Sequence, residues 1–180
     1  MDRAQILAGI KRVLSGEESF YSFHTDCPLE KRMDFIFSIL FHARSRPAFY
    51  LRYIICRLAM FVDYSPAKVL LYRMAGTNIG EGVYISPDVF IDPNFPQLIE
   101  LEDYCVLGWG AVIACHQYSG HTYSLGRVKI GRGSVIGHHA TIAPGTTIKP
   151  MVCIPRHGII TRKTEPGALH CFGDKYISSP

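Results

Sequence analysis

The most regular feature of the chain is a six-residue repeat of Ile and Leu in its second half. Each hexad begins with one of these side chains, and its fifth residue is usually small or β-branched. A helix would repeat about every 3.6 residues and an alternating strand every two, so neither explains a strict period of six. A β-solenoid does, because each hexad forms one flat face and its first side chain points into a shared core. The eleven hexads begin at Ile79, Ile85, Ile91, Leu101, Leu107, Ile113, Ile130, Ile136, Ile142, Ile148 and Ile154.

This pattern resembles the hexapeptide-repeat acyltransferases over about residues 76–173. The resemblance implies a mainly β fold, a left-handed parallel β-helix of about four coils with three hexads in each triangular coil. Coil one then spans 79–96, coil two 101–118 and coil three 130–147, and coil four starts at residue 148. Both longer interruptions fall between coils, where an insertion extrudes a loop without breaking the ladder. An antiparallel sandwich with Ile-rich strands would predict a period of two instead.

The chain divides by pattern into a helical cap (1–75), a β-helix domain (76–173) with an extruded loop (119–129), and a C-terminal tail (174–180). In the cap, apolar residues follow helix spacing rather than the hexad. Helix start and stop signals such as Pro and Gly mark the ends of four expected helices. These run from Ala4 to Gly16, from Pro28 to Phe41, from near Pro47 to Phe61, and from Ser65 to Gly76.

The N-terminal helices have two candidate roles. They could cap the solenoid, because the edge of its first coil must be covered. They could also make a peripheral contact with an anionic bilayer. Neither apolar stretch reaches the ~20 uninterrupted residues of a membrane span, so we expect no crossing. The residues that suggest a bilayer contact are Arg44, Arg46, Arg52 and Arg57 beside Phe41, Phe49, Tyr50 and Tyr53.

Composition narrows the class of protein. A chain of 180 residues can hold one substantial core and a helical appendage. With 48% hydrophobic and 19% charged residues, it suits an oligomer or a surface-associated protein. A net charge of +4 without a patterned basic patch does not favour nucleic acid. The six cysteines show no CxxC or Cys/His spacing, and no signal-peptide core opens the chain. We expect reduced thiols in the cytoplasm, or at the inner face of the membrane.

The resemblance also implies an activity, the transfer of an acyl group from coenzyme A to a hydroxyl or amine. A hydroxyl is a poor nucleophile near neutral pH, so the reaction needs a general base, most often His. The segment from Leu107 to Tyr118 is similar to the family segment in which a His follows the Ile-rich strand before an extruded loop. His116 is therefore the predicted general base. The alternative is that His116 is simply a solvent-facing residue at a corner of the solenoid.

Four residues are predicted to bind the acceptor. Asp92 lies in a segment, Ile-Asp-Pro-Asn-Phe-Pro, that resembles the subgroup acetylating sugars of surface polysaccharides. There the preceding coil supplies acidic side chains near the acceptor, although an Asp beside a Pro also suits a turn. His121 could touch the acceptor or stay idle in the loop. Tyr118 and Tyr123 could stack on a sugar ring or simply pack. The predicted acceptor is thus a hydroxyl of a sugar or glycan intermediate.

The resemblance implies acetyl-CoA as the donor, bound in a groove shared by neighbouring subunits. Thr161 and Arg162 match a family segment whose Thr and basic residue approach the coenzyme, and Lys163 adds a cation for its phosphates. These three could equally form a solvated basic turn. His138, Ala143 and Arg156 are the other residues predicted to line the donor groove.

The chain departs from the family pattern at the donor groove. His138 and Arg156 stand where the family usually has small residues, and the usual C-terminal turn appears as Phe172-Gly-Asp-Lys175. Bulk at these positions could block the groove, shift it or suit another donor. A scaffold that has lost catalysis and binds partners through its helices therefore stays an alternative.

The sequence also gives expectations for the assembly and the metal content of the protein. The resemblance implies a homotrimer of about 60 kDa, three chains of 20.2 kDa. We expect no metal, although some β-helices of this architecture hold zinc with three His, as γ-class carbonic anhydrases do. In that alternative His116 and His121 would be joined by His138 or His139.

Overall fold

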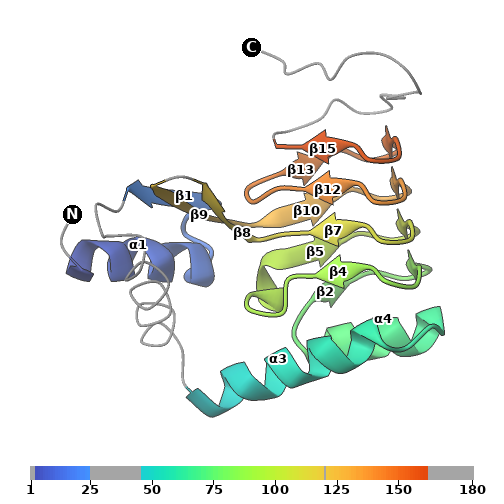
Figure 1. Ribbon diagram of the computed structural model, residues 1–180, viewed down its shortest axis with the longest axis horizontal. Coiled ribbons are helices and arrows are strands. Elements are labelled where there is room, and N and C mark those ends of the chain that lie inside the picture. Colours follow the sequence, from blue (N-terminus) through green and yellow to red (C-terminus); the bar gives the residue numbers. More distant parts are fainter. Residues whose placement is uncertain (1–2, 25–45, 120, 162–180) are drawn as a thin grey trace.

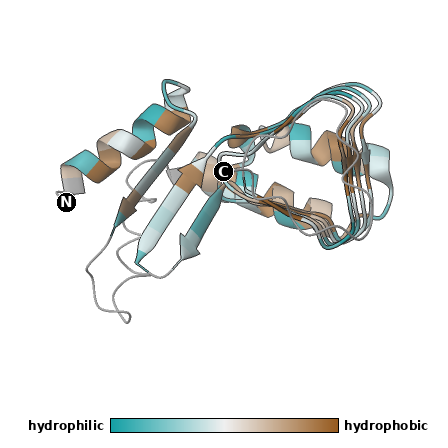
Figure 2. Ribbon diagram, turned by 90° about the horizontal axis from the view of Figure 1, so that it is seen from above, coloured by the Kyte–Doolittle hydropathy of each residue, from teal (hydrophilic) through white to brown (hydrophobic). Residues whose placement is uncertain are grey.

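The computed structural model describes residues 3–24, 46–119 and 121–161. They form a three-sided solenoid with two helices beneath its first coil and a small sheet at its side (Figure 1). Viewed along its axis, the coils superpose as a triangle and the small sheet projects from one corner (Figure 2). Within these three ranges, no helix has the length and apolar character that a bilayer crossing requires.

Each side of the solenoid is a parallel sheet of four short strands, one from each coil. Face 1 contains β2 (Asn78–Ile79), β5 (Ile99–Leu101), β10 (Val128–Ile130) and β13 (Thr147–Ile148). Face 2 contains β3 (Tyr84–Ile85), β6 (Val106–Leu107), β11 (Val135–Ile136) and β14 (Cys153–Ile154). Face 3 contains β4 (Phe90–Ile91), β7 (Val112–Ile113), β12 (Thr141–Ile142) and β15 (Ile159–Ile160).

The hexads lie in register from coil to coil. On face 1, Ile79 pairs with Leu101, Leu101 with Ile130, and Ile130 with Ile148. The first residues of the other hexads pair in the same way on faces 2 and 3. Nearly all of them are buried in one continuous core. The predicted parallel β-helix of four coils is confirmed, together with the starting residue of each coil.

The turns between faces depend on the fourth residue of each hexad. This residue has a positive φ in nine of the eleven hexads, from 54° at His139 to 78° at Gly145. A left-handed residue turns the chain sharply at each edge, and Gly adopts this conformation without steric cost. The two hexads without it are those of Asn94 and His116, where the chain leaves the solenoid. The insertions therefore replace turns and leave the strands intact.

The helices beneath coil one close its open edge. Helix α3 (Arg46–Met60) packs against α4 (Ser65–Met74), which lies on the strands of coil one (Figure 1). Lys68, buried on α4, donates from Nζ to the carbonyl oxygen of Ser86 at 2.8 Å. The buried Tyr72 hydroxyl donates to the carbonyl oxygen of Val89 at 3.4 Å. These carbonyls belong to the first coil, which has no preceding coil to donate to them.

Two more side chains of α4 complete the cap. Arg73 donates from Nε to the carbonyl oxygen of Ile79 at 3.0 Å and from Nη2 to that of Gly80 at 2.6 Å. The Ser65 hydroxyl oxygen accepts from the backbone N–H of Ile85 at 2.9 Å. Polar groups of faces 1, 2 and 3 in coil one are thus paired by one helix. The capping role expected for the N-terminal region is present in α4.

The insertion after coil two is a β-hairpin rather than an irregular loop. Strand β8 (His116–Ser119) pairs with β9 (Thr122–Gly126), and β9 pairs with β1 (Phe20–His24). All three strands are antiparallel. β1 is a strand in a region expected to be helical, because β9 offers an open edge that an extended segment can satisfy.

Three of the four expected helices are confirmed. Helix α1 (Arg3–Ser15) matches the first, and α3 and α4 match the third and fourth. α1 packs against β1 beside the solenoid, with the ring of Tyr21 against Gly9. It therefore covers the small sheet rather than the end of coil one. The expected helix from Pro28 lies outside the described residues, as do the tail and the turn at Phe172–Lys175.

Candidate active site

His116 lies at the point where coil two gives way to the hairpin. It is the fourth residue of its hexad but has no left-handed φ, because strand β8 begins there. The side chain sits at the edge between faces 3 and 1, and 29% of its surface is exposed. Its imidazole is therefore partly enclosed and still reachable.

Asp92 holds the His116 ring. Oδ2 of Asp92 lies 2.5 Å from Nδ1 of His116 and also accepts from the backbone N–H of Cys115 at 3.0 Å. Oδ1 accepts from the backbone N–H of Asn94 at 3.0 Å, an Asx turn. The carboxylate is fully buried. With Oδ2 facing it, Nδ1 is the nitrogen that carries hydrogen, which leaves Nε2 as the basic nitrogen.

The contact with His116 is not the one predicted for Asp92. The sequence predicted that Asp92 binds the acceptor, and this stays a prediction. In the structure its carboxylate is buried, receives three hydrogen bonds from its own chain and orients the His116 ring. The signal for this contact is the register, since Asp92 and His116 follow the paired Ile91 and Ile113 on adjacent coils.

Aromatic rings wall the His116 imidazole. Phe95 lies edge-on with its centroid 5.6 Å away, and Tyr123 is stacked at 6.1 Å. Tyr118 is opposite Tyr123 in the hairpin, so both rings lie on the same face as His116. The hydroxyl of Tyr118 is enclosed and has no hydrogen-bond partner within the described part of the chain. The structure thus brings together four of the predicted site residues, Asp92, His116, Tyr118 and Tyr123.

His121 lies apart from this group. It is exposed in the hairpin turn, and its ring is 5.4 Å from that of His24. Three residues of strand β8 separate that turn from His116, roughly 10 Å of extended chain. Among residues 3–24, 46–119 and 121–161, no three His, Cys, Asp or Glu side chains form a group that could hold a metal ion.

The residues predicted to bind the donor are divided between two edges. Ile142 and Ile160 pair in register on face 3. Ala143 and Thr161 are the residues that follow them, so they lie at the edge between faces 3 and 1, where His116 also lies. His138 and Arg156 are exposed in the turns between β11 and β12 and between β14 and β15. They lie at the opposite edge of face 3. Arg162 and Lys163 fall outside the described residues.

The edge of His138 and Arg156 carries further rings, of which the sequence analysis named His139 but not Trp109 or His157. Trp109 donates from Nε1 to Oδ2 of Asp88 at 2.7 Å, and its ring meets that of His139 at 4.7 Å. His139 in turn stacks on His157, with centroids 5.3 Å apart and ring planes at 8°. Their signal in the sequence is the third and fourth place of equivalent hexads on successive coils. Indole and imidazole rings therefore crowd this edge.

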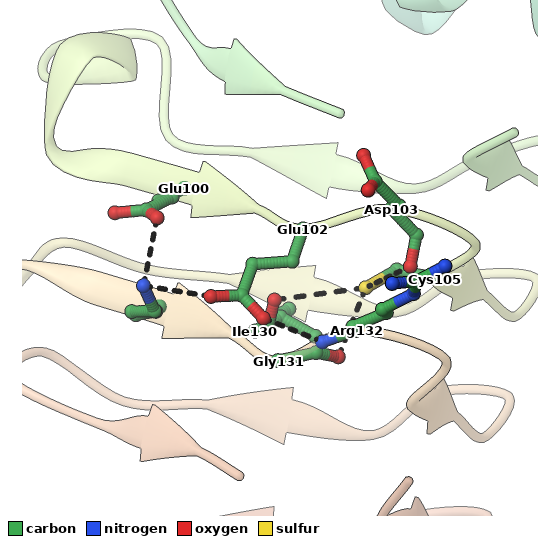
Figure 3. Close-up of polar contacts among 8 residues, drawn as sticks. Glu100, Glu102, Asp103, Cys105, Ile130, Gly131 and Arg132 are labelled. Carbon is green, nitrogen blue, oxygen red and sulfur yellow. Dashed lines mark hydrogen bonds and ion pairs between the residues drawn. The ribbon is translucent and has the colours of Figure 1, made fainter. Parts of the chain in front are cut away.

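The polar cluster on face 1 is structural. Lys129 Nζ lies 2.8 Å from a carboxylate oxygen of Glu100 and 2.7 Å from one of Glu102, and so joins coils two and three (Figure 3). The hydrogen bond from Lys129 and that from the backbone N–H of Arg132 lower the pKa of Glu102. A hollow of about 340 Å³ opens beside this cluster, on face 1 rather than beside His116. Ion pairs between neighbouring strands account for the cluster without a ligand.

The buried thiol of the second coil is unsuited to catalysis. Burial raises the pKa of Cys105 to about 11, and its sulfur lies 3.2 Å from the carbonyl oxygen of Gly131. A thiol at neutral pH is a weak nucleophile. Of the titratable groups in the solenoid core, His116 with Asp92 is the arrangement that can accept a proton from a bound molecule.

Known proteins share this sequence pattern and fold. No protein-family model matches the chain. A curated protein of Bacillus subtilis (strain 168), named "Putative acetyltransferase YvoF", is 26% identical over 118 residues, 65% of this chain and 69% of that protein. A maltose O-acetyltransferase from Clostridium difficile 630 superposes with a TM-score of 0.52 and 16% identity, covering 68% of this chain and 81% of that one. A hexapeptide-repeat containing acetyltransferase, VCA0836 from Vibrio cholerae, gives 0.49 and 14% over 68% and 85%.

The family predicted from the sequence agrees with these similarities. Eleven hexads stack in four coils, in register on all three faces. The curated relative carries the same family's activity in its name, and the Clostridium structure shares the fold. The chain is thus similar to the hexapeptide-repeat acyltransferases in its repeat and in its fold, a parallel β-helix.

Proposed function

We propose that the protein transfers an acetyl group from acetyl-CoA to a hydroxyl of a sugar or glycan intermediate. The observation that carries this proposal is the Asp92–His116 pair, which places a partly exposed imidazole at an edge of a hexapeptide solenoid. The names of the relatives support the transfer of an acetyl group. The Clostridium neighbour is named a maltose O-acetyltransferase, which supports a sugar hydroxyl as the acceptor.

In the proposed reaction, Nε2 of His116 removes the proton from the acceptor hydroxyl. The hydroxyl oxygen attacks the thioester carbonyl, the carbon–sulfur bond breaks, and coenzyme A leaves as a thiolate that takes the proton back from the imidazolium. Asp92 keeps the ring in the required tautomer and stabilises its charge when Nε2 is protonated. Tyr118 and Tyr123 line the approach of the acceptor, with His121 farther out on the hairpin.

We further propose a homotrimer whose sites lie between subunits. Within one chain, face 3 separates His116 from His138 and Arg156, so the predicted base and part of the predicted donor groove need a neighbour to meet. The outward side chains of face 1 are polar, whereas those of faces 2 and 3 are mostly apolar. They are Asn78, Glu100, Lys129 and Thr147 on face 1; Tyr84, Val106, Val135 and Cys153 on face 2; and Phe90, Val112, Thr141 and Ile159 on face 3.

Apolar faces of this kind need covering in a stable assembly. Ala143, Thr161, Arg162 and Lys163 would then hold coenzyme A near His116, while His138 and Arg156 come from the next subunit. Cys105 and Cys153 are free thiols, which supports the cytoplasm as the compartment.

The experiment that tests the activity is a thiol-release screen. Purified full-length protein and acetyl-CoA are mixed with sugars, nucleotide-sugars and amino sugars, and free coenzyme A is scored with a thiol reagent. The proposal expects release with a hydroxyl acceptor and an ester product by mass spectrometry. Release with amino sugars alone, giving an amide, would replace O-acetyl by N-acetyl transfer. An inert protein that still binds acetyl-CoA would point to an acceptor class outside sugars.

A second candidate function is a scaffold that has lost its donor groove. The observation in its favour is the bulk at the edge between faces 2 and 3, where Trp109, His138 and Arg156 occupy the third place of equivalent hexads on successive coils. Calorimetry with coenzyme A separates the two functions. No heat at millimolar ligand, with binding restored by Arg156→Ala and His138→Ser, would favour the scaffold. Binding by the native protein would favour the transferase.

A further inference from the structure

Helices α3 and α4 lie beneath coil one (Figure 1). They carry large apolar side chains that are exposed. On α3 and the residue after it they recur at the spacing of one helical stripe, and on α4 they are four residues apart. Their exposed fractions are 61% for Leu51, 53% for Ile54, 55% for Leu58, 79% for Phe61, 59% for Leu70 and 62% for Met74. These six side chains are named the base surface here.

The base surface faces away from the solenoid. On α3 the buried residues are Cys56 and Ala59, and the helical period places the exposed stripe on the opposite side. On α4 the buried Val69 and Tyr72 lie against the core, and the exposed pair is again opposite. The cap therefore uses one side of each helix for the first coil and leaves the other side uncovered by the described residues.

The charge around the base surface is almost all positive. Between Arg46 and Gly76 the sequence has five basic residues and one acidic residue, Asp63. α3 itself contains no carboxylate, and neither does α4. Lys68 is buried against coil one and Arg73 donates to carbonyls of that coil, whereas Arg57 is exposed on the arc of α3 next to the apolar stripe. The surface thus combines apolar side chains with an exposed arginine, and neither helix offers it a carboxylate.

From this combination we infer that the base surface docks on an anionic lipid bilayer. Helices with an apolar side, aromatic residues and arginines but few carboxylates lie in the headgroup plane, where the apolar side is buried and cations meet anionic lipids. α3 and α4 would lie flat on the membrane with the solenoid pointing away from it. This geometry suits the described helices, none of which could span a bilayer.

A second copy of the chain fits the base surface less well. Two base surfaces in a symmetric contact would place the Arg57 of each copy against helices without a carboxylate, with Asp63 as the one carboxylate between residues 46 and 76. An anionic bilayer supplies the charge opposite to that of Arg57. The inference is independent of the proposed chemistry, and its test measures no activity.

The test is flotation of the full-length protein with vesicles of phosphatidylcholine alone or with one third phosphatidylglycerol. Binding to the anionic vesicles should exceed binding to the neutral ones about tenfold and should fall as salt is raised. Leu58→Glu with Phe61→Glu should lower it at least tenfold, because both side chains lose their apolar burial. Met151→Glu is the matched control, since Met151 is 69% exposed on the solenoid, and it should bind like the native protein.

Three results would overturn the inference. Native protein might float with neither vesicle, or equally with both at all salt concentrations. Leu58→Glu with Phe61→Glu could float unchanged while its circular dichroism and melting temperature match the native protein. Sedimentation could also show that this variant halves the mass of the assembly, which would make the base surface a contact between copies.

Discussion

At the residue scale, the site depends on how one buried carboxylate is satisfied. Asp92 accepts hydrogen bonds from two backbone N–H groups and from His116, so its charge is compensated without solvent. If an asparagine replaced Asp92, its NH₂ group would face a hydrogen-bond donor, whichever of the two oxygens it replaced. The residue therefore decides both the orientation and the tautomer of the imidazole.

Asp92→Asn should lower kcat on the order of 10²–10⁴-fold while changing coenzyme A affinity only a few fold. The asparagine keeps the size of the side chain but loses one acceptor and the charge that stabilises the imidazolium. Steady-state kinetics and calorimetry with coenzyme A give the two quantities. An equal loss of donor affinity would mean that Asp92 acts on the donor and not through His116.

The ion pairs on face 1 give a prediction for pH. The pKa of Glu102 is lowered by its hydrogen bonds, chiefly that from Lys129, so the carboxylate stabilises the fold above the ordinary Glu value and loses this effect as pH falls through its lowered pKa. The Lys129 side chain is 43% exposed and that of Glu102 31%, so the effect is small, about 1 kcal/mol or less.

Glu102→Gln should therefore lower the melting temperature near pH 7 by about 2–4 °C or less. The difference from the native protein should shrink as pH falls from the ordinary Glu value through the lowered pKa of Glu102, because the native carboxylate is then protonated as well. Thermal melts of both proteins over this range measure the difference. A difference that stays the same at every pH would assign the loss to packing rather than to charge.

At the element scale, α4 acts as the missing coil before coil one. Its side chains reach carbonyls and an N–H that in later coils are paired by the neighbouring strand. Burial lowers the pKa of Lys68, with the carboxylates of Asp63 and Asp88 opposing that effect. The Lys68 side chain is nevertheless retained in the cap, since its Nζ pairs an edge carbonyl.

Lys68→Met should destabilise the fold by about 1–3 kcal/mol, because the carbonyl of Ser86 then stays buried without a donor. Urea unfolding followed by circular dichroism measures the change. Lys11→Met is the matched control on the exposed surface of α1 and should shift stability by less than about 0.5 kcal/mol. If the two variants unfold alike, the cap does not depend on this hydrogen bond.

The hexad period was sufficient to predict the elements of the solenoid. Every coil starts where the spacing of Ile and Leu places it, because a shared core fixes the register of each strand. The period could not predict β1. Phe20–His24 has no hexad, and its strand conformation depends on the edge of β9, about a hundred residues later in the chain.

The site was predictable to a lesser extent. His116 was predicted as the base from the segment that precedes it, and this role stays a prediction. Its contact with Asp92 depends on the register that brings the two coils together. The ring ladder of Trp109, His139 and His157 also depends on stacking between coils. Such contacts join residues far apart in sequence, and only the spacing of the coils reveals them.

At the scale of the whole molecule, the three faces of the solenoid differ in polarity. Face 1 presents charged and amide side chains, and faces 2 and 3 present mostly apolar ones, among them Val135 and Ile159. Val135 is 39% exposed and Ile159 61%. If the chain forms the proposed trimer, these two faces supply the contacts between subunits.

Val135→Asp with Ile159→Asp should convert a trimer of about 60 kDa into monomers of 20.2 kDa. A buried charge without a partner is costly at an interface. Multi-angle light scattering measures the mass, and Thr147→Asp on face 1 serves as the control that should stay trimeric. A native protein that is monomeric at micromolar concentration would remove the site shared between subunits.

The most direct test of the central claim is the rate of coenzyme A release by His116→Ala compared with His121→Ala, using the acceptor found in the screen. His116→Ala should lower kcat on the order of 10²–10⁴-fold and leave acetyl-CoA affinity within a few fold. His121→Ala should change mainly the KM for the acceptor, because His121 lies at the far end of the hairpin. Small and equal effects of the two substitutions would contradict the claim that His116, positioned by Asp92, is the general base.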